Sequence, residues 1–284
     1  MALVRHGRGP RAAVAALASQ VHPVFMLPPV AASGFGGLLS GGYALGPGLL
    51  HACAVFAGLY TAHVKDGYVD FYVRDEDDDH PLTARGCWVA VGLATAAFAI
   101  CLGGVWATAG PLAAALTAPG WAIGYLHAPQ LDTNPVTATA GYPAGIALAL
   151  LGGFAAQTGA LSARVGAFAA VLLVVVSGIK VIDDAQDVAY DRSIGKRTVA
   201  VALGVGRARR VAHALLGAGL LGVVALGAVR VFPPSTAAAS VVLGAVAVAA
   251  RGADPERATM LLVRGSYLFL AVLLATTWTA PLGG

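Results

Sequence analysis

The sequence predicts an all-α, polytopic membrane protein with about nine transmembrane helices in one bundle around a central cavity. Of its 284 residues, 58% are hydrophobic and only 11% are charged, whereas a soluble domain carries about 25% charged residues. The mean hydropathy is +0.76, and apolar runs of about 20 residues, the length that crosses a bilayer, recur along the chain. Lipid must therefore surround much of this apolar surface.

The apolar stretches are continuous rather than alternating, which excludes transmembrane β-strands. Abundant glycine and alanine suit the close packing of helices in lipid. No change in composition marks a second domain, so we expect residues 1–284 to form a single transmembrane domain. The predicted spans lie near residues 12–33, 45–64, 86–105, 109–127, 140–158, 164–182, 209–230, 236–250 and 260–279.

The first stretch follows three arginines, Arg5, Arg8 and Arg11, as the apolar core of a signal peptide would. It continues past Pro23 and Pro28 without a clear cleavage site of small residues. We therefore expect the segment to be retained as the first span.

The distribution of charge predicts a cytoplasmic N-terminus. Nine spans from an inside start leave only Arg164 and Arg230, of 18 Lys and Arg residues, on the outer side. The net charge of +4 therefore reflects membrane orientation, and we expect no nucleic-acid partner. All 14 acidic residues fall on the cytoplasmic side, so both acidic linkers share one face. The linkers expected there are 65–85, 128–139, 183–208 and 251–259.

An aspartate cluster begins the linker after the sixth span. Asp184, Asp187 and Asp191 are spaced i, i+3 and i+7, which predicts one face of a helix. Like charges this close repel each other and raise each other's pKa, unless cations occupy the site. Carboxylate oxygens suit Mg²⁺, which binds one or two carboxylates together with substrate phosphates.

A second acidic cluster follows the second span. Asp66 and Asp70 lie one helical turn apart, facing the same way. The five consecutive acids at 75–79 cannot share a face, and we interpret them as a solvated loop, with direct involvement in metal recruitment as the alternative. Two carboxylate rows on one membrane surface predict a clamp that holds a diphosphate through bridging Mg²⁺, while an apolar tail lies among the helices.

These patterns resemble the UbiA superfamily of intramembrane prenyltransferases over most of the chain. The aspartate triplet 184, 187 and 191, then Arg192, Gly195, Arg197-Thr198 and Leu203-Gly204, is similar to the second Asp-rich motif of that family. Three further matches are less specific: His22-Pro23 near the first span, Asp66 and Asp70 followed by His80-Pro81-Leu82, and the segment from Tyr125 to Asp132.

The resemblance implies Mg²⁺-dependent transfer of a prenyl group from an allylic diphosphate to a lipophilic acceptor, with release of diphosphate. Acceptors in the family include quinone precursors, glycerol-phosphate lipids and carotenoids. The expected partners are therefore a prenyl diphosphate, the acceptor and membrane lipid. The sequence predicts neither the acceptor, nor the prenyl length, nor the oligomeric state.

The site residues that we expect fall into three groups. The metal ligands are Asp66, Asp70, Asp184, Asp187 and Asp191. The catalytic residues are Lys180, Asp184, Arg197 and Tyr125. The substrate-binding residues are His63, Lys65, Arg74, Tyr68, Tyr142 and Lys196.

The chain departs from the family pattern at the first motif, which fits in two incomplete registers. With Asp66 and Asp70 as its last two acids, the expected Asn-Asp is Ala62-His63. With Asp70 as its middle acid, Arg74 occupies the position of the last acid. Asp132 replaces a lysine of the family, which disfavours an acidic acceptor.

Two other functions are compatible with part of the pattern. CDP-alcohol phosphotransferases also carry Asp-Gly on a membrane helix, but Asp66-Gly67 lacks the Ala-Arg that follows in those enzymes. A cation-coupled transporter would use intramembrane carboxylates. The aspartates here gather at one surface rather than at the midplane, which opposes alternating access.

Overall fold

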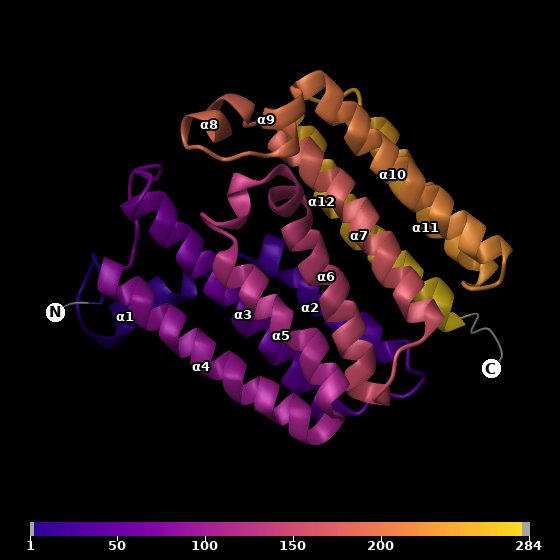
Figure 1. The fold of residues 1–284 in the computed structure, drawn as a ribbon, viewed down its shortest axis with the longest axis horizontal. Helices are drawn as coiled ribbons and strands as arrows, with labels where there is room; N and C mark the ends of the chain where they lie inside the picture. The colour runs from indigo at the N-terminus through magenta and orange to yellow at the C-terminus, as the bar shows by residue number, and fades with distance from the viewer. Residues whose placement is uncertain (1–2, 280–284) are drawn as a thin grey trace. The chain divides into compact units, whose positions relative to one another are not determined.

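The computed structural model describes residues 3–279, and the regular elements within them are helical (Figure 1). One isolated antiparallel bridge joins Val4 and Leu82. The helices are α1 Gly9–Ala18, α2 Pro23–Leu38, α3 Leu45–Tyr72, α4 Ala84–Ala109, α5 Pro111–Leu126, η1 Leu131–Thr133, α6 Pro135–Thr158, α7 Ala163–Asp184, α8 Val188–Ser193, α9 Val199–Leu203, α10 Val205–Ala228, η2 Pro234–Thr236, α11 Ala237–Ala250 and α12 Pro255–Thr279. The all-α fold class is confirmed.

The chain divides into two compact units. Unit 1 contains residues 1–132 and 148–160, and unit 2 contains residues 133–147 and 161–284. Helix α6 contributes its first half to unit 2 and its second half to unit 1.

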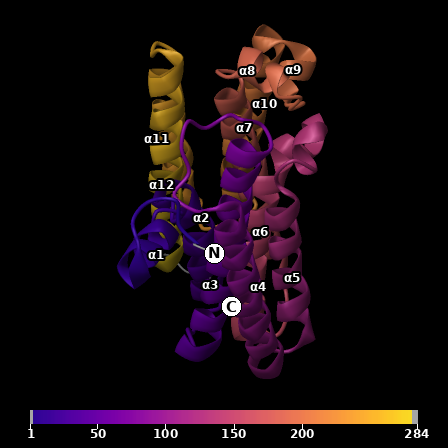
Figure 2. The same ribbon diagram turned by 90° about the vertical axis from the view of Figure 1, so that its left-hand side faces the viewer.

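In unit 1, the long helix α3 packs against α2, α4 and α5 (Figure 2). Glycines let backbones approach closely within it: a Cβ at Gly36 or Gly153 would collide with the backbone of Leu150 or Ser33, respectively. These glycines therefore join α2 to the second half of α6, as close helix packing in lipid requires.

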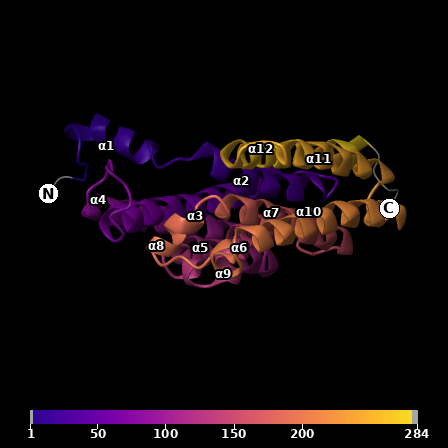
Figure 3. The same cartoon turned by 90° about the horizontal axis from the view of Figure 1, so that it is seen from above.

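In unit 2, α7 packs against α10, and α11 packs against α12 (Figure 3). A Cβ at Gly178 of α7 would lie 3.0 Å from the carbonyl oxygen of Ala212 on α10. The large buried rings Phe168 and Phe232 stack with centroids 3.9 Å apart. The stacked rings hold the beginning of α7, and the close contact at Gly178 holds its last turns, where the second aspartate cluster begins.

Within the described residues 3–279, six helices are long and apolar enough to cross a membrane, or seven if the bent pair α1–α2 is one span. The expected first span is therefore a pair of helices that meet at 68°, with Pro23 starting the second. Helix α5 has 16 residues, about 24 Å at 1.5 Å per residue, against a bilayer core of about 30 Å. The multi-pass membrane character holds, and the count of nine spans is not confirmed.

Candidate functional site: two aspartate motifs

Asp66 and Asp70 lie on the last two turns of α3, so the predicted single helical face is confirmed for this pair. The N–H of Val73 donates to the carbonyl of Val69 as in the helix, and the N–H of Arg74 donates to the same carbonyl from five residues on, which closes the helix there. Asp66, Asp70 and Arg74 therefore follow one another at intervals of four residues along one side of this segment.

Arg74 bridges two carboxylates inside unit 1. Its Nη1 donates to Asp70 Oδ1 at 3.2 Å and its Nη2 to Asp132 Oδ2 at 2.9 Å. The side chains of Arg74 and Asp132 are 8% and 9% exposed. Burial opposes the charge of Arg74, but the hydrogen bond and negative charge of Asp132, with those of Asp70, raise its pKa overall. The result is a buried, charged triad.

Lys65 is buried and holds the segment after α5 against α3. Its Nζ donates to the carbonyls of Tyr125 and Ala128, the latter at 2.7 Å, and to Gln130 Oε1 at 2.9 Å. It also lies 4.4 Å from the centroid of the Tyr125 ring. An ammonium group has three protons to donate, and all three have acceptors here. This geometry favours a positioning role for Lys65 over direct contact with a phosphate.

The other predicted residues of unit 1 are engaged in ring contacts. His63 stacks on His22 with centroids 4.8 Å apart. Tyr68 packs edge-on against Trp88 of α4 at 5.2 Å. Since Tyr68 is two residues from both Asp66 and Asp70, it points away from their face of the helix, and the structure does not group it with them.

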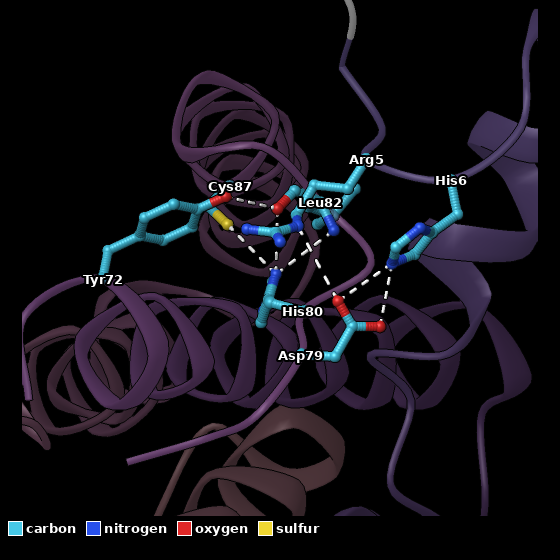
Figure 4. A network of polar contacts seen from close by, with 7 residues as sticks. All are labelled: Arg5, His6, Tyr72, Asp79, His80, Leu82 and Cys87. Carbon is cyan, nitrogen blue, oxygen red and sulfur yellow. Dashed lines mark hydrogen bonds and ion pairs between the residues drawn. The ribbon is translucent and has the colours of Figure 1, made fainter. Parts of the chain in front are cut away.

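The N-terminal segment crosses the loop that follows the first motif. Thr83 N–H donates to the carbonyl of Leu3, beside the Val4–Leu82 bridge. His6 Nε2 lies 2.8–2.9 Å from both oxygens of Asp79, and Arg5 lies 3.7 Å from the same carboxylate (Figure 4). The hydrogen bond from His6 lowers the pKa of the Asp79 carboxyl. The acidic loop is thus tied down at its C-terminal end.

His80, next in the loop, is buried. Its Nδ1 lies 3.1 Å from the carbonyl of Leu82 and 3.8 Å from Cys87 Sγ (Figure 4). Tyr72 Oη donates to the same carbonyl at 2.9 Å. A Cβ at Gly67 would lie 2.8 Å from His80 Nε2, so glycine at this position lets the ring pack against α3 between Asp66 and Asp70.

The second motif does not lie on one continuous helix, and that prediction is wrong. Helix α7 ends at Asp184, residues 185–187 form a turn, and α8 begins at Val188. A carboxylate is unfavourable at the C-terminal end of a helix, where the helix dipole is negative, and favourable at the N-terminal end of the next helix. Asp183 and Asp184 therefore end α7, while Asp187 takes the N-cap position of α8.

Asp184 is 6% exposed and is held by Lys180 from the preceding turn. Lys180 Nζ donates to Asp184 Oδ1 at 2.5 Å and to Asp183 Oδ2 at 3.2 Å. The second oxygen, Asp184 Oδ2, is buried and has no hydrogen-bond partner among the described residues. A buried carboxylate oxygen without a donor is costly unless something binds it, so it is a candidate ligand for a cation.

Asp191, on α8, is 5% exposed and accepts a hydrogen bond from Thr198 Oγ1 at 3.4 Å. Burial raises the pKa of the Asp191 carboxyl to about 6, and the charge of Asp184 adds to this against the opposing charge of Lys196. The negative charge of Asp184 therefore opposes ionisation of the Asp191 carboxyl. Gly195, at φ +77°, ends α8 and returns the chain toward Thr198.

The remaining predicted residues of unit 2 are set differently. Asp187 and Arg197 are exposed, and Lys196 is half-buried beside Asp191. Tyr142 lies on the first half of α6. Thr198 belongs to the motif but is not among the predicted site residues; its hydroxyl donates to Asp191 and accepts from Val201 N–H, which caps α9.

Comparison with known proteins decides the family. The profile of the UbiA prenyltransferase family matches residues 79–273 of this chain. The chain belongs to this family. UbiA proteins are prenyltransferases, so this chain is a prenyltransferase enzyme of the membrane. The match begins at Asp79, after the first motif, and includes the whole second motif.

Solved UbiA structures share the fold. A structure of digeranylgeranylglyceryl phosphate synthase is similar with a TM-score of 0.73 and 10% identity, over 95% of this chain and 99% of that one. A UbiA homologue from Archaeoglobus fulgidus, bound to DMAPP and Mg²⁺, has a TM-score of 0.68 and 15% identity, over 95% of this chain and 100% of that one. An apo UbiA homologue from Aeropyrum pernix K1 has a TM-score of 0.68 and 19% identity, over 89% of this chain and 97% of that one. No curated protein matches this chain by sequence.

The family implies Mg²⁺, and the residues of the second motif fit it. The motif supplies the hard oxygens that Mg²⁺ prefers, and one of them, Asp184 Oδ2, is buried without a donor. Within residues 3–279, however, no group of three or more acidic, histidine or cysteine side chains is arranged to hold a metal. Magnesium that uses one or two carboxylates and completes its shell with phosphate and water is compatible with both findings.

Proposed function

We propose that this UbiA enzyme transfers a prenyl group from an allylic diphosphate to a lipophilic acceptor in a Mg²⁺-dependent reaction. The observation that carries the proposal is the pair of buried carboxylates in the second motif. Asp184 has an oxygen without a hydrogen-bond partner among the described residues, and the pKa of the Asp191 carboxyl is raised. Such a site is unfavourable without a cation. One or two of the carboxylates of Asp184, Asp187 and Asp191 would hold Mg²⁺ together with phosphate and water, and the ion would draw charge from the allylic C–O bond as the diphosphate leaves.

The residues around the motif prepare it for this reaction. Lys180 fixes one oxygen of Asp184 so that the other stays oriented, and Thr198 does the same for Asp191. Lys196 and Arg197 follow directly and supply positive charge for the departing diphosphate. The C–O bond breaks with its electron pair on the diphosphate, the acceptor donates a pair to the allylic carbon, and the acceptor then loses a proton.

From the charge pattern of the sequence, we propose that Asp66 and Asp70 serve the same diphosphate from the first motif. We also propose that residues 1–284 act as one transmembrane domain with the acidic segments on the cytoplasmic side. The positive-inside pattern supports this orientation.

For the acceptor, we propose a neutral lipophilic molecule. Two features support it: Asp132 is a carboxylate where the family has a lysine, and the nearby cation Arg74 is bound to Asp132 and Asp70. A negatively charged acceptor would meet an unfavourable field here. Carotenoids and uncharged quinone precursors fit this description better than a glycerol-phosphate lipid.

The test is a transfer assay with the purified chain in proteoliposomes. Radiolabelled dimethylallyl, geranyl, farnesyl and geranylgeranyl diphosphates are each supplied with lipid extract from cells that lack this gene, the extract being separated into neutral and acidic fractions. We expect a labelled lipid and released diphosphate with Mg²⁺, from the neutral fraction, and neither in excess chelator. No labelled product with any of the four donors would contradict the proposal.

A further inference from the structure

Helix α1 has a fixed position on unit 1. The hydroxyl of Tyr60 on α3 donates to the carbonyl of Leu17, near the end of α1, at 2.8 Å. Before α1, Val4 forms the bridge with Leu82 of the loop between α3 and α4, beside the contacts shown in Figure 4. Unit 1 therefore holds α1 at both ends. Because α1 meets α2 at 68°, it does not continue the direction of that helix.

The contacts of α1 place it at the level where α3 leaves the membrane core. Tyr60 lies five residues before Lys65, the first lysine, arginine or acidic residue of α3. At 1.5 Å per residue, Leu17 therefore lies about 8 Å below the level of Lys65 along α3. Val4, by contrast, contacts the loop beyond the end of α3. Helix α1 runs from the water side to a depth typical of interfacial helices, which enter the membrane by about 5–10 Å.

Aromatic side chains mark the same level. Tyr68 and Tyr72 pack on the buried cluster that also receives Ala12 and Ala13 of α1. Trp88 of α4 is 43% exposed, and its ring lies 5.2 Å from the ring of Tyr68. Tryptophan and tyrosine gather at membrane–water boundaries, where their rings lie among the lipid headgroups. These rings indicate that α1 lies in the headgroup layer.

The side of α1 that faces away from this cluster is basic at one end and apolar at the other. We call it the outward face of α1, and its exposed residues are Arg8, Arg11, Val14, Ala15 and Ala18. Val14 is 65% exposed. The arginines lie toward the water side and the apolar residues toward the membrane core. This order suits a helix in the boundary layer, with guanidinium groups at the level of the lipid phosphates.

Arg8 and Arg11 have no acidic partner among the described residues. The first 65 residues of the chain contain no aspartate or glutamate, and Asp79, beside the N-terminal segment, is held by Arg5 and His6. No ion pair in the described part of the chain includes Arg8 or Arg11. The helix dipole also disfavours positive charge at the N-terminal end of a helix, so these arginines do not stabilise α1. A negative partner from outside the chain would complement them.

We propose that the outward face of α1 binds acidic phospholipids of the membrane that the protein spans. Arg8 and Arg11 donate to the lipid phosphate, which guanidinium groups bind in a fork, and Val14 and Ala18 contact the upper part of the acyl chains. The negative charge of the headgroup complements the two arginines, and the membrane presents it at the level where they lie. The inference is independent of the proposed function, because it concerns the surrounding lipid and not the reaction.

The experiment measures which lipid lies beside α1. The full chain is reconstituted in vesicles with equal amounts of phosphatidylglycerol and phosphatidylcholine, and one of the two lipids at a time carries brominated acyl chains, which quench tryptophan fluorescence at short range. Trp88 is the reporter, because its ring contacts Tyr68 on the cluster against which α1 packs. The contribution of Trp88 is the difference between each protein and the same protein with Trp88→Phe.

We expect phosphatidylglycerol to be preferred around Trp88 by about fivefold or more in the wild type, since each arginine near an acidic surface contributes about that factor. Arg8→Gln combined with Arg11→Gln should bring the preference close to one, and Arg8→Glu combined with Arg11→Glu should bring it below one. Equal quenching by the two lipids in the wild type, or a preference that survives the glutamine pair, overturns the inference.

A matched variant separates this face from the net charge of the protein. Arg209→Gln combined with Arg210→Gln removes the same charge from exposed positions of α10 in unit 2, and the preference around Trp88 should stay as in the wild type. An equal loss of preference in this variant contradicts the inference. Arg8→Lys combined with Arg11→Lys keeps the charge and should keep most of the preference, and its complete loss would contradict the electrostatic argument.

The salt dependence of the wild type gives a test that needs no substitution in α1. At 1 M salt the Debye length is about 3 Å, so the preference for phosphatidylglycerol around Trp88 should fall toward one. A preference that does not change with salt overturns the inference even if the α1 variants fail to fold. The melting temperature of each variant in detergent shows whether it is folded.

Discussion

Lys65→Met separates a structural role from a substrate-binding role for this lysine. The side chain is 5% exposed and donates to the carbonyls of Tyr125 and Ala128 and to Gln130 Oε1. Methionine keeps much of the length and removes all three donors. If Lys65 holds the segment after α5, the substitution should lower the stability of the fold, whereas a phosphate ligand on the surface of the site would mainly affect substrate binding.

The expected magnitude follows from the acceptors that lose their donor. A buried polar group left unsatisfied costs about 1–3 kcal/mol. Two backbone carbonyls are affected, since water can replace the donor at the exposed Gln130. Relief from burying an ammonium offsets part of this loss, so we expect a net loss of about 2–3 kcal/mol. At 2–4 °C per kcal/mol for chains somewhat smaller than this one, the melting temperature should fall by about 4–12 °C.

The assay is thermal unfolding in detergent, followed by steady-state kinetics at a temperature where both proteins are folded. Lys196→Met is the matched control, because Lys196 is half-buried beside Asp191 and is proposed to face the diphosphate. We expect Lys196→Met to raise KM with little change in melting temperature, and Lys65→Met to do the reverse. An unchanged melting temperature with a raised KM for Lys65→Met would refute the structural role.

Three further predictions concern the two motifs. Asp187→Ala should abolish Mg²⁺-dependent turnover while the protein stays folded in detergent, and near-normal turnover would remove the assigned metal role. The pKa of the Asp191 carboxyl is raised to about 6 in the fold, so its protonation stabilises the metal-free protein fully below the pKa of an ordinary aspartate, and this contribution is lost as the pH rises through about 6. Mg²⁺ binds the ionised carboxylate, so the affinity of the protein for Mg²⁺ should fall below pH 6. The same pH dependence of Mg²⁺ affinity in Asp191→Asn would contradict this. His6→Ala should make the loop 75–79 more sensitive to protease, because it removes the side-chain contact between the N-terminal segment and Asp79. Asp79→Asn should give a similar change, and equal cleavage rates would show that the N-terminal segment does not restrain the loop.

Local sequence patterns predicted the helices well. Each of the nine apolar stretches coincides with a helix or, for the first, with the bent pair α1–α2. A continuous apolar stretch is a property of residues that are neighbours along the chain, so the helix that it predicts does not depend on contacts with distant residues. The number of spans is not confirmed, because it depends on helix length and bending, as in α5 and in the break before Pro23.

The site was less accessible to sequence reasoning where its contacts join distant residues. The spacing of Asp66 and Asp70 predicted their shared helical face, which is confirmed. The pairing of Arg74 with Asp132 and the bonds of Lys65 join residues about sixty positions apart, and no periodicity reports them. One signal existed for the first: Asp132 stands where the family has a lysine, and in one of the two registers of the first motif Arg74 stands where the family has an acid.

The break in the second motif had a different cause. The spacing 184, 187 and 191 fits one helical face, but the fit ignores the end of α7, which the charges of Asp183 and Asp184 favour. Thr198 was visible as a possible N-cap for the next helix, and a threonine seven residues after Asp191 could have been examined as its partner.

The central claim is that both motifs act on one diphosphate, and a double-mutant cycle on pyrophosphate affinity tests it most directly. The cycle uses Asp66→Asn and Asp187→Asn, singly and together, with Mg²⁺ present. Groups that share a ligand show coupling energies of about 0.5–3 kcal/mol, whereas independent sites add within about 0.5 kcal/mol. We expect a coupling of at least about 1 kcal/mol, and strictly additive losses would show that the two motifs serve separate sites.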